Sequence, residues 1–117
     1  MNEPLFVYGT LRGGHPAAEL TGFRRREDAA CPTIEPADDT VHGQIVHVDD
    51  WAAKDRYEGH RPGEPEGSLY WRLVTSDGVH VYVGNPEMAD YHWGDRWDVD
   101  YDYEEVREAA AAAEVLR

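Results

Sequence analysis

The strongest constraint on the fold of this chain is a pair of alternating segments joined by a tight turn. Residues 69–75 and 79–83 are rich in β-branched and aromatic side chains, and Ser76-Asp77-Gly78 lies between them. Asp-Gly in this position favours a β-hairpin, because these residues adopt the backbone conformations that a short turn requires. The chain is therefore expected to contain antiparallel sheet.

Two further segments predict strands. Residues 5–8 form an apolar run that ends at Gly9, and residues 41–48 alternate along their length. We expect an exposed edge strand at residues 24–26. The prolines and aspartates between residues 32 and 39 predict a turn region.

Three segments predict helices. Pro16 is suited to open a short helix at residues 16–20, because proline is tolerated in a first helical turn. Asp50 offers an N-cap for a second short helix at residues 51–57. Residues 102–116 predict the terminal helix, which begins with capping-box spacing. Its apolar face is formed by Val106, Ala109, Ala110, Ala113 and Leu116.

Length and composition favour one compact domain. The 117 residues form a single domain, 1–117, and 41% of them are hydrophobic, which argues against disorder. Cys31 is the only cysteine, so an intrachain disulfide framework and a multi-cysteine metal site are excluded. No apolar run approaches the ~18 residues of a membrane span, and no signal-peptide pattern is visible. We expect a soluble, cytoplasmic protein.

The charge is strongly negative. The chain has 24 acidic and 11 basic residues, a formal charge of −13, and Lys54 is its only lysine. This balance disfavours binding to nucleic acid or to an anionic membrane, because both depend on Lys and Arg neutralising phosphate. Dispersed acids with almost no lysine are typical of halophilic proteins. The alternative is an ordinary acidic protein encoded by a GC-rich genome.

The histidines and aspartates do not predict a metal site. His42 and His47 are five residues apart on an expected strand, so their side chains point to opposite faces. Asp98, Asp100 and Asp102 alternate, but the glycine and glutamate of a calcium loop are missing at the required spacing. We expect an acidic, solvated segment that leads into a helix.

Two local features point to chemistry. The strand that ends at Gly9 leads into Thr10 and Leu11, and successive N–H groups at such a turn are suited to hold a carboxylate or an oxyanion. Glu58 directly follows Tyr57 at the C-terminal end of the short helix expected at 51–57, where the helix dipole disfavours a negative charge. The alternatives are a plain structural turn and an ordinary exposed acid.

Together these segments resemble the gamma-glutamylcyclotransferase-like family. Leu5-Phe6-Val7-Tyr8-Gly9-Thr10-Leu11-Arg12 is similar to the first signature of that family, and Asp55-Arg56-Tyr57-Glu58-Gly59 is similar to its second. Further similar segments follow in the family's order: Tyr70-x-Arg72, Val81-Tyr82-Val83 and Gly94-Asp95-Arg96-Trp97-Asp98. The resemblance covers most of the chain and is strongest to the gamma-glutamylamine cyclotransferase branch.

The resemblance implies an α+β fold, a small mixed β-barrel flanked by short helices. It implies an enzyme that cyclises a gamma-glutamyl amine or amino acid, releasing 5-oxoproline and an amine, with no metal, nucleotide or other cofactor. Glu58 would be the general acid and base. The residues that would bind the substrate are Tyr8, Gly9, Thr10, Leu11 and Tyr70.

Other functions remain open on the sequence alone. The same scaffold can bind a small metabolite or a partner without turnover, or transfer an acyl group from a different donor. If the chain is an enzyme, we expect the Gly- and Pro-rich loop at residues 59–68 to border the site and partly cover it. The sequence does not predict an oligomeric state.

Overall fold

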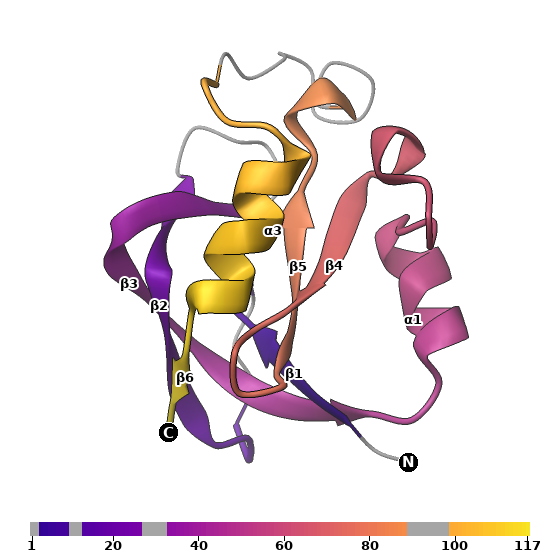
Figure 1. Cartoon of the computed structure of the whole chain (residues 1–117). Coiled ribbons are helices and arrows are strands. Elements are labelled where there is room, and N and C mark those ends of the chain that lie inside the picture. The colour runs from indigo at the N-terminus through magenta and orange to yellow at the C-terminus, as the bar shows by residue number, and fades with distance from the viewer. Residues whose placement is uncertain (1–2, 10–12, 27–32, 89–98) are drawn as a thin grey trace.

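The described residues form a curved six-stranded sheet with a helix packed across it (Figure 1). The computed structural model describes residues 3–9, 13–26, 33–88 and 99–117. The strands are β1 (Glu3–Val7), β2 (Ala17–Arg26), β3 (Thr33–Val48), β4 (Tyr70–Val74), β5 (His80–Gly84) and β6 (Val115–Leu116). Within the described ranges the helices are α1 (Trp51–Glu58) and α3 (Tyr103–Ala112), with 3-10 turns η1 (Pro65–Gly67) and η2 (Pro86–Met88).

The sheet is mixed and open. Its strand order is β4-β5-β1-β3-β2-β6; β1 and β5 are parallel and the other pairs antiparallel. The α+β class is confirmed. The expectation of a small mixed β-barrel is wrong. The sheet is open, because β4 and β6 each pair with only one strand among the residues described.

The two edges of the sheet approach each other without forming a ladder. Ser76 donates to the carbonyl of Ala113 from its backbone N–H at 3.0 Å and from Oγ at 2.7 Å. The N–H of Val115 donates to Asp77 Oδ2 at 3.1 Å. The turn of the β4–β5 hairpin is thus tied to the segment between α3 and β6, and α3 occupies the place where a barrel would close.

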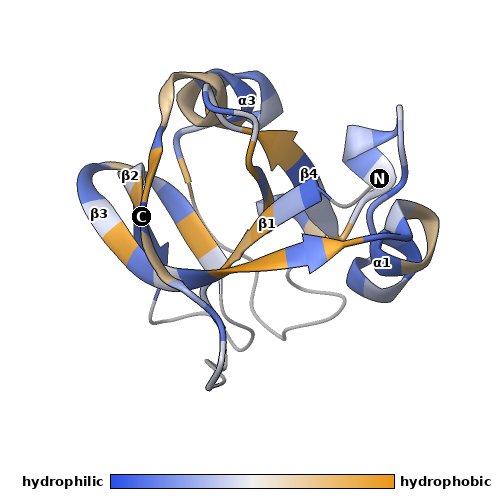
Figure 2. Cartoon of the chain, turned by 90° about the horizontal axis from the view of Figure 1, so that it is seen from below, coloured by the Kyte–Doolittle hydropathy of each residue, from blue (hydrophilic) through white to orange (hydrophobic). Residues whose placement is uncertain are grey.

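The core lies between α3 and the concave face of the sheet. Helix α3 contributes Val106 and Ala110, both fully buried, with Ala109 partly buried beside them. Burial of each large apolar side chain stabilises the folded state by roughly 1.5–3 kcal/mol. The sheet contributes Phe6, Leu20, Phe23, Ile34, Val41, Ile45, Leu73 and Val81. Figure 2 shows that α1 lies apart from α3 and is coloured mostly hydrophilic.

Several expected elements are confirmed. The β4–β5 hairpin forms with Tyr70 opposite Gly84, and residues 5–7 and 41–48 lie in strands. The strand expected at 24–26 is the end of β2. The short helix forms as α1.

Two expectations about the N-terminal half are wrong. Residues 17–20 are the start of β2 rather than a helix, because Ala17 and Leu20 pair with Gln44 and Val41 of β3 and Leu20 is fully buried. The turn expected between residues 32 and 39 is absent from residues 33–39, which lie in β3. Pro36 is accommodated because it faces Phe23, next to the register shift between β2 and β3.

The terminal helix is shorter than predicted. Asp102 caps it by accepting from the N–H of Glu105 at 2.9 Å, as expected, but the helix ends at Ala112. Leu116 lies in β6 and is 48% exposed, so its place on the buried helical face is wrong. The chain leaves the helix because the N–H of Thr21 bonds to the carbonyl of Glu114 at 3.0 Å, which joins the last segment to β2. No helix in the described part of the chain is long and apolar enough to cross a bilayer.

Candidate functional site

Helix α1 places Glu58 at its last residue. The helix begins after Asp50, whose Oδ1 accepts from the N–H of Ala53 at 3.1 Å, so the expected N-cap is confirmed. It is only eight residues long. A helix of this length is marginal alone, so its position depends on its ends and its tertiary contacts.

The helix is stopped at Gly59. This glycine has φ 74°, in the left-handed region, and the N–H of His60 reaches back to the carbonyl of Asp55 at 2.8 Å. A Cβ at position 59 would lie 2.8 Å from Cβ of Leu69. Both conformation and space therefore require glycine here, and the turn directly after Glu58 is fixed.

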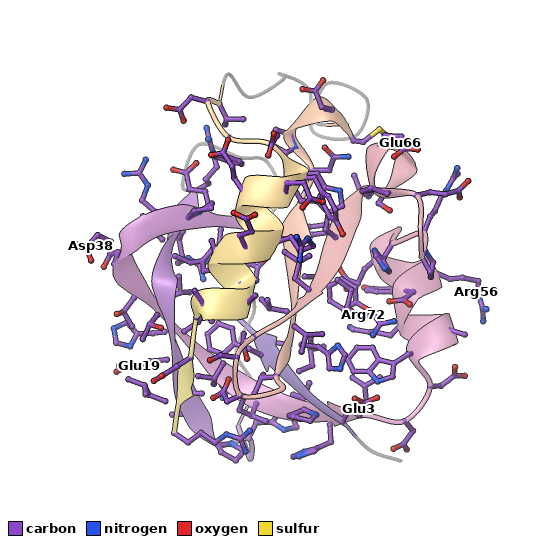
Figure 3. The ribbon with its side chains drawn as sticks, in the orientation of Figure 1. Glu3, Glu19, Asp38, Arg56, Glu66 and Arg72 are labelled. Carbon is purple, nitrogen blue, oxygen red and sulfur yellow. The ribbon has the colours of Figure 1, made fainter. Side chains whose placement is uncertain are left out.

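A buried ion pair holds α1 against the sheet. Asp55 is the only buried residue of α1. Arg72 of β4 donates to both of its carboxylate oxygens, from Nε at 2.9 Å and from Nη2 at 3.1 Å. The hydroxyl of Tyr82 on β5 donates to Asp55 Oδ1 at 2.6 Å. Directional polar bonds, rather than apolar packing, therefore set the rotation of α1, with Arg72 reaching from β4 toward it (Figure 3).

A second set of contacts surrounds Arg72. Its guanidinium has only donors, so Nδ1 of His80 accepts at 3.2 Å and Nε2–H of His80 donates to Glu3 at 3.1 Å. This hydrogen bond lowers the pKa of Glu3. The Trp51 ring lies 4.5 Å from the Arg72 guanidinium carbon, and its Nε1 donates to Glu3 at 3.1 Å. The start of β1, the start of α1 and the hairpin are joined in one polar network.

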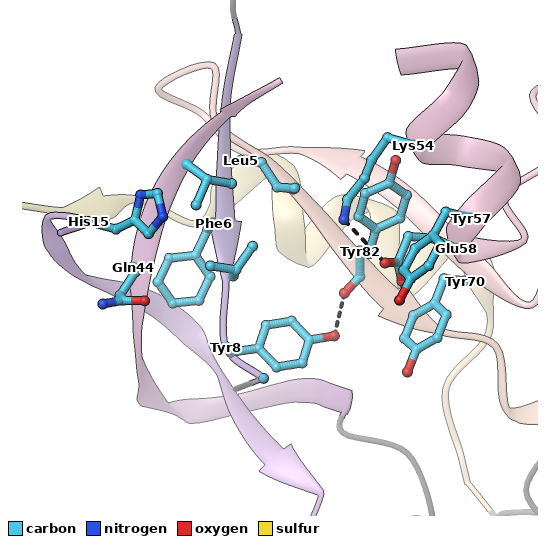
Figure 4. A pocket seen from close by; sticks show the side chains of 13 residues that line it. Leu5, Phe6, Tyr8, His15, Gln44, Lys54, Tyr57, Glu58, Tyr70 and Tyr82 are labelled. Carbon is cyan, nitrogen blue, oxygen red and sulfur yellow. Dashed lines mark hydrogen bonds and ion pairs between the residues drawn. The ribbon is translucent and has the colours of Figure 1, made fainter. Parts of the chain in front are cut away.

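Glu58 opens into a cavity of about 560 Å³ between α1 and the sheet (Figure 4). The side chain of Glu58 is 22% exposed, and its Oε1 lies 3.4 Å from Nζ of Lys54, one helical turn earlier. Tyr8 and Gly9 at the end of β1 line the same cavity, as do Tyr70 and Tyr82. The cavity thus brings together a carboxylate, an ammonium group and several tyrosines.

Two tyrosines at the cavity wall, Tyr8 and Tyr82, are held as neutral phenols. Burial raises the pKa of Tyr8 above its ordinary value, and the charge of Glu58 adds to the effect. Burial and the hydrogen bond to Asp55 likewise raise the pKa of Tyr82. Tyr8 donates its hydroxyl hydrogen to the carbonyl of Tyr82 at 2.5 Å, so this hydrogen is already used within the protein.

Gly9 lines the cavity, and the turn expected after it runs into residues that the structure does not describe. Its φ is not positive, and a Cβ placed on it would meet no atom of the protein within 4 Å. Its lack of a side chain leaves open space at the strand end rather than relieving strain. The carbonyl just before it, on Tyr8, accepts from Arg25, which fixes the direction of the strand end.

Of the predicted site residues, the structure brings four together around the cavity: Tyr8, Gly9, Glu58 and Tyr70. Thr10 and Leu11 lie outside the described residues. No residue between 59 and 69 lines the cavity, so the expectation that this loop borders and covers it is wrong.

Sequence reasoning missed several lining residues, among them Lys54, Tyr57 and Tyr82. A signal for Lys54 was present, because it is the only lysine and lies four residues before Glu58. Tyr82 was also within reach, since it alternates with the core residues Val81 and Val83 and so faces the other side of β5.

Comparison with family models, with curated proteins and with solved structures found no match to this chain. The arrangement of the site must therefore be interpreted from its chemistry. A half-buried carboxylate beside a lysine and neutral phenols is suited to bind a small molecule with an amine and to move a proton to and from it.

Proposed function

We propose that this protein is a gamma-glutamylcyclotransferase-type enzyme. Its substrate is a gamma-glutamyl amide, and its products are 5-oxoproline and a free amine. Glu58 is the general acid and base, and the end of β1 at Tyr8-Gly9 holds the glutamyl part of the substrate. The observation that most supports this proposal is that Glu58 and this strand end line one cavity.

The proposed reaction needs one group that takes and returns a proton. The Glu58 carboxylate takes a proton from the substrate's α-ammonium. The free α-amine then attacks the γ-carbonyl carbon, and a five-membered ring forms. After attack, the ring nitrogen carries one proton more than the lactam nitrogen of 5-oxoproline. As the amide C–N bond breaks, protonated Glu58 gives its proton to the leaving nitrogen, and the extra proton of the ring nitrogen passes through the Glu58 carboxylate to the released amine, which leaves as an ammonium. Attack is intramolecular, so the main tasks of the protein are to fold the substrate and to transfer the proton.

The remaining lining residues have roles in this proposal. Tyr70 and Tyr82 form the wall beside Glu58, and Tyr8 lines the cavity at the strand end. Open space at Gly9 allows a substrate to approach the backbone closely. The developing negative charge on the γ-carbonyl oxygen would be met by backbone N–H groups at the strand end.

The direct test is a screen of gamma-glutamyl amides for release of 5-oxoproline. The panel contains leaving groups that are anionic, neutral and cationic, together with a matched amide whose α-amine is acetylated. We expect release from at least one amide and none from the acetylated control, because a blocked amine cannot cyclise.

The non-catalytic alternative predicts a different result. If no amide releases 5-oxoproline above the rate without protein, the catalytic proposal is overturned. Binding of the same amides, followed by NMR shifts of cavity residues, would then assign the cavity to a metabolite-binding domain.

A further inference from the structure

The wall of the cavity on α1 carries two opposite charges one helical turn apart. Nζ of Lys54 lies 3.4 Å from Oε1 of Glu58, and the two side chains are 32% and 22% exposed. A partly exposed pair at this spacing contributes little to stability. The proposed function assigns a role to Glu58 and none to Lys54, although Lys54 lines the same cavity.

This ion pair is complementary to the head of an amino acid, which carries an ammonium and a carboxylate on one carbon. Proton transfer requires the α-ammonium to lie against Glu58. The α-carboxylate is bonded to the same carbon as the α-ammonium, and Lys54 lies next to Glu58. With the ammonium against Glu58, the α-carboxylate is therefore adjacent to Lys54. Two ion pairs with the ligand would replace the one within the helix.

Other observations favour Lys54 over alternative cations. The chain has a formal charge of −13, so an anionic group needs a local positive charge to approach. His15 also lines the cavity, but Figure 4 shows it beside Gln44, away from Glu58. Nζ of Lys54 lies 5.2 Å from the centre of the Tyr57 ring, a contact that keeps the ammonium at the cavity wall.

We propose that Lys54 is a specificity-determining residue that binds the α-carboxylate of the glutamyl group. The inference rests on the proposed function and deepens it, because it restricts the substrates to gamma-linked glutamyl compounds whose α-amine and α-carboxylate are both free. It also leaves the strand end at Tyr8-Gly9 for the γ-carbonyl oxygen.

The test compares two ligands that differ only in the α-carboxylate, L-glutamine and 4-aminobutanamide. Binding is measured by NMR titration for the intact protein and for Lys54→Met, Lys54→Arg and Arg56→Met. Arg56 is an exposed residue of the same helix that does not line the cavity and projects outward from the molecule in Figure 3, so its replacement removes an equal charge elsewhere. The NMR spectrum of each variant reports whether it is folded.

We expect Lys54→Met to weaken L-glutamine binding by about 10- to 100-fold, the loss typical of a hydrogen bond to a charged group. It should not weaken the binding of 4-aminobutanamide. Lys54→Arg should keep most of the affinity for L-glutamine, and Arg56→Met should bind both ligands as the intact protein does. Equal weakening of both ligands in Lys54→Met, or no binding of L-glutamine to the intact protein, would overturn the inference.

The same samples separate this inference from the proposed function. In one outcome, Lys54→Met loses L-glutamine binding but the intact protein releases no 5-oxoproline from any gamma-glutamyl amide. That outcome would support the role of Lys54 in binding and overturn the proposed enzymatic function. If the intact protein releases 5-oxoproline and Lys54→Met releases it equally well, the proposed enzymatic function is supported and the role of Lys54 is overturned.

Discussion

At Gly59 the backbone, rather than a side chain, decides where the candidate base lies. Replacement by alanine puts a Cβ into the left-handed region at φ 74° and 2.8 Å from Cβ of Leu69. We expect Gly59→Ala to lower the free energy of unfolding by about 1–3 kcal/mol, measured by urea denaturation. Gly63→Ala is the control, because Gly63 has φ 77° and a Cβ placed there would meet no atom within 4 Å. Equal losses in the two variants would contradict the role of the Leu69 contact.

His60 ties the loop after α1 to the outer edge of β4. Its Nδ1 accepts from the backbone N–H of Arg72 at 3.2 Å, and burial lowers its pKa, although the charge of Asp55 acts in the opposite direction. In the unfolded chain, His60 therefore becomes protonated near pH 6.5, whereas in the folded chain it stays neutral at this pH and becomes protonated only at a lower one. Stability should fall as the pH drops below about 6.5, until the lowered folded-state pKa is reached.

The contribution of His60 is measured by comparison with His60→Gln. Free energies of unfolding at about pH 7.5 and 5.5 bracket the ordinary pKa of histidine. The intact protein should lose more stability between these values than the variant does. Equal losses would mean that His60 titrates alike in the folded and unfolded states.

Single residues differed in how well the sequence predicted them. Glu58 was found because a carboxylate followed by glycine at a helix end is unusual in itself. Gly9 was expected in the site and lines the cavity, whereas the turn expected after it falls on residues outside the described ranges. Lys54 was missed because an i,i+4 ion pair has the same pattern on a solvated helix as in a cavity wall.

Among the elements, α1 is unusual because a charge takes the place of an apolar anchor. Replacing Asp55 by Asn breaks the pair with Arg72, whose side chain is 21% exposed and would lose its counter-charge. We expect a loss of about 2–4 kcal/mol in the free energy of unfolding, less than the ~3–5 kcal/mol of a fully buried pair because Arg72 stays partly in contact with water. Glu104→Gln is the control, because Glu104 and Arg107 form a pair at 2.7 Å with both side chains about half exposed. That change should cost no more than about 1 kcal/mol. Similar losses in both variants would contradict the anchoring role of Asp55.

Elements were predictable where local signals agreed with tertiary pairing. The Asp-Gly turn and the Asp50 and Asp102 caps act within a few residues, so the hairpin and both helix starts were found. Residues 17–20 have no strong local signal, and their strand conformation comes from pairing with β3. The last residues of the chain became β6 because β2 offers hydrogen-bond partners that an alanine-rich sequence does not reveal.

For the whole molecule, the acidic surface predicts a dependence on salt. The Cα atoms extend over 34 × 31 × 26 Å, and Figure 3 shows Glu19 and Asp38 on one side of the molecule and Glu66 on the opposite side. At ~10 mM salt the screening length is about 30 Å, so charges repel across the entire protein, whereas at ~1 M it is about 3 Å. The thermal midpoint should therefore rise with salt. A midpoint that is constant or falls would contradict a halophilic adaptation and favour an ordinary acidic protein.

Whether the sheet closes into a barrel is a property of the whole molecule. The α+β class could be inferred from local patterns, and five of the six strands in the described residues were expected at least in part. Closure depends on what lies between the edge strands. In the described residues, α3 and the contacts of Ser76 and Asp77 occupy that place. Nothing in the pattern of the individual strands distinguishes this arrangement from a barrel.

The central claim is that Glu58 moves the proton in 5-oxoproline formation. The measurement is the rate of 5-oxoproline release from an active gamma-glutamyl amide by Glu58→Gln, beside the intact protein and Glu66→Gln. Glu66 lies in η1 and does not line the cavity of Glu58, so its replacement removes an equal charge elsewhere. Glutamine keeps the shape of the side chain but cannot accept the proton, so release should fall by about 10²–10⁴-fold while the fold is retained and Glu66→Gln stays near the intact rate. Full activity in Glu58→Gln would contradict the assignment of Glu58 as the acid and base.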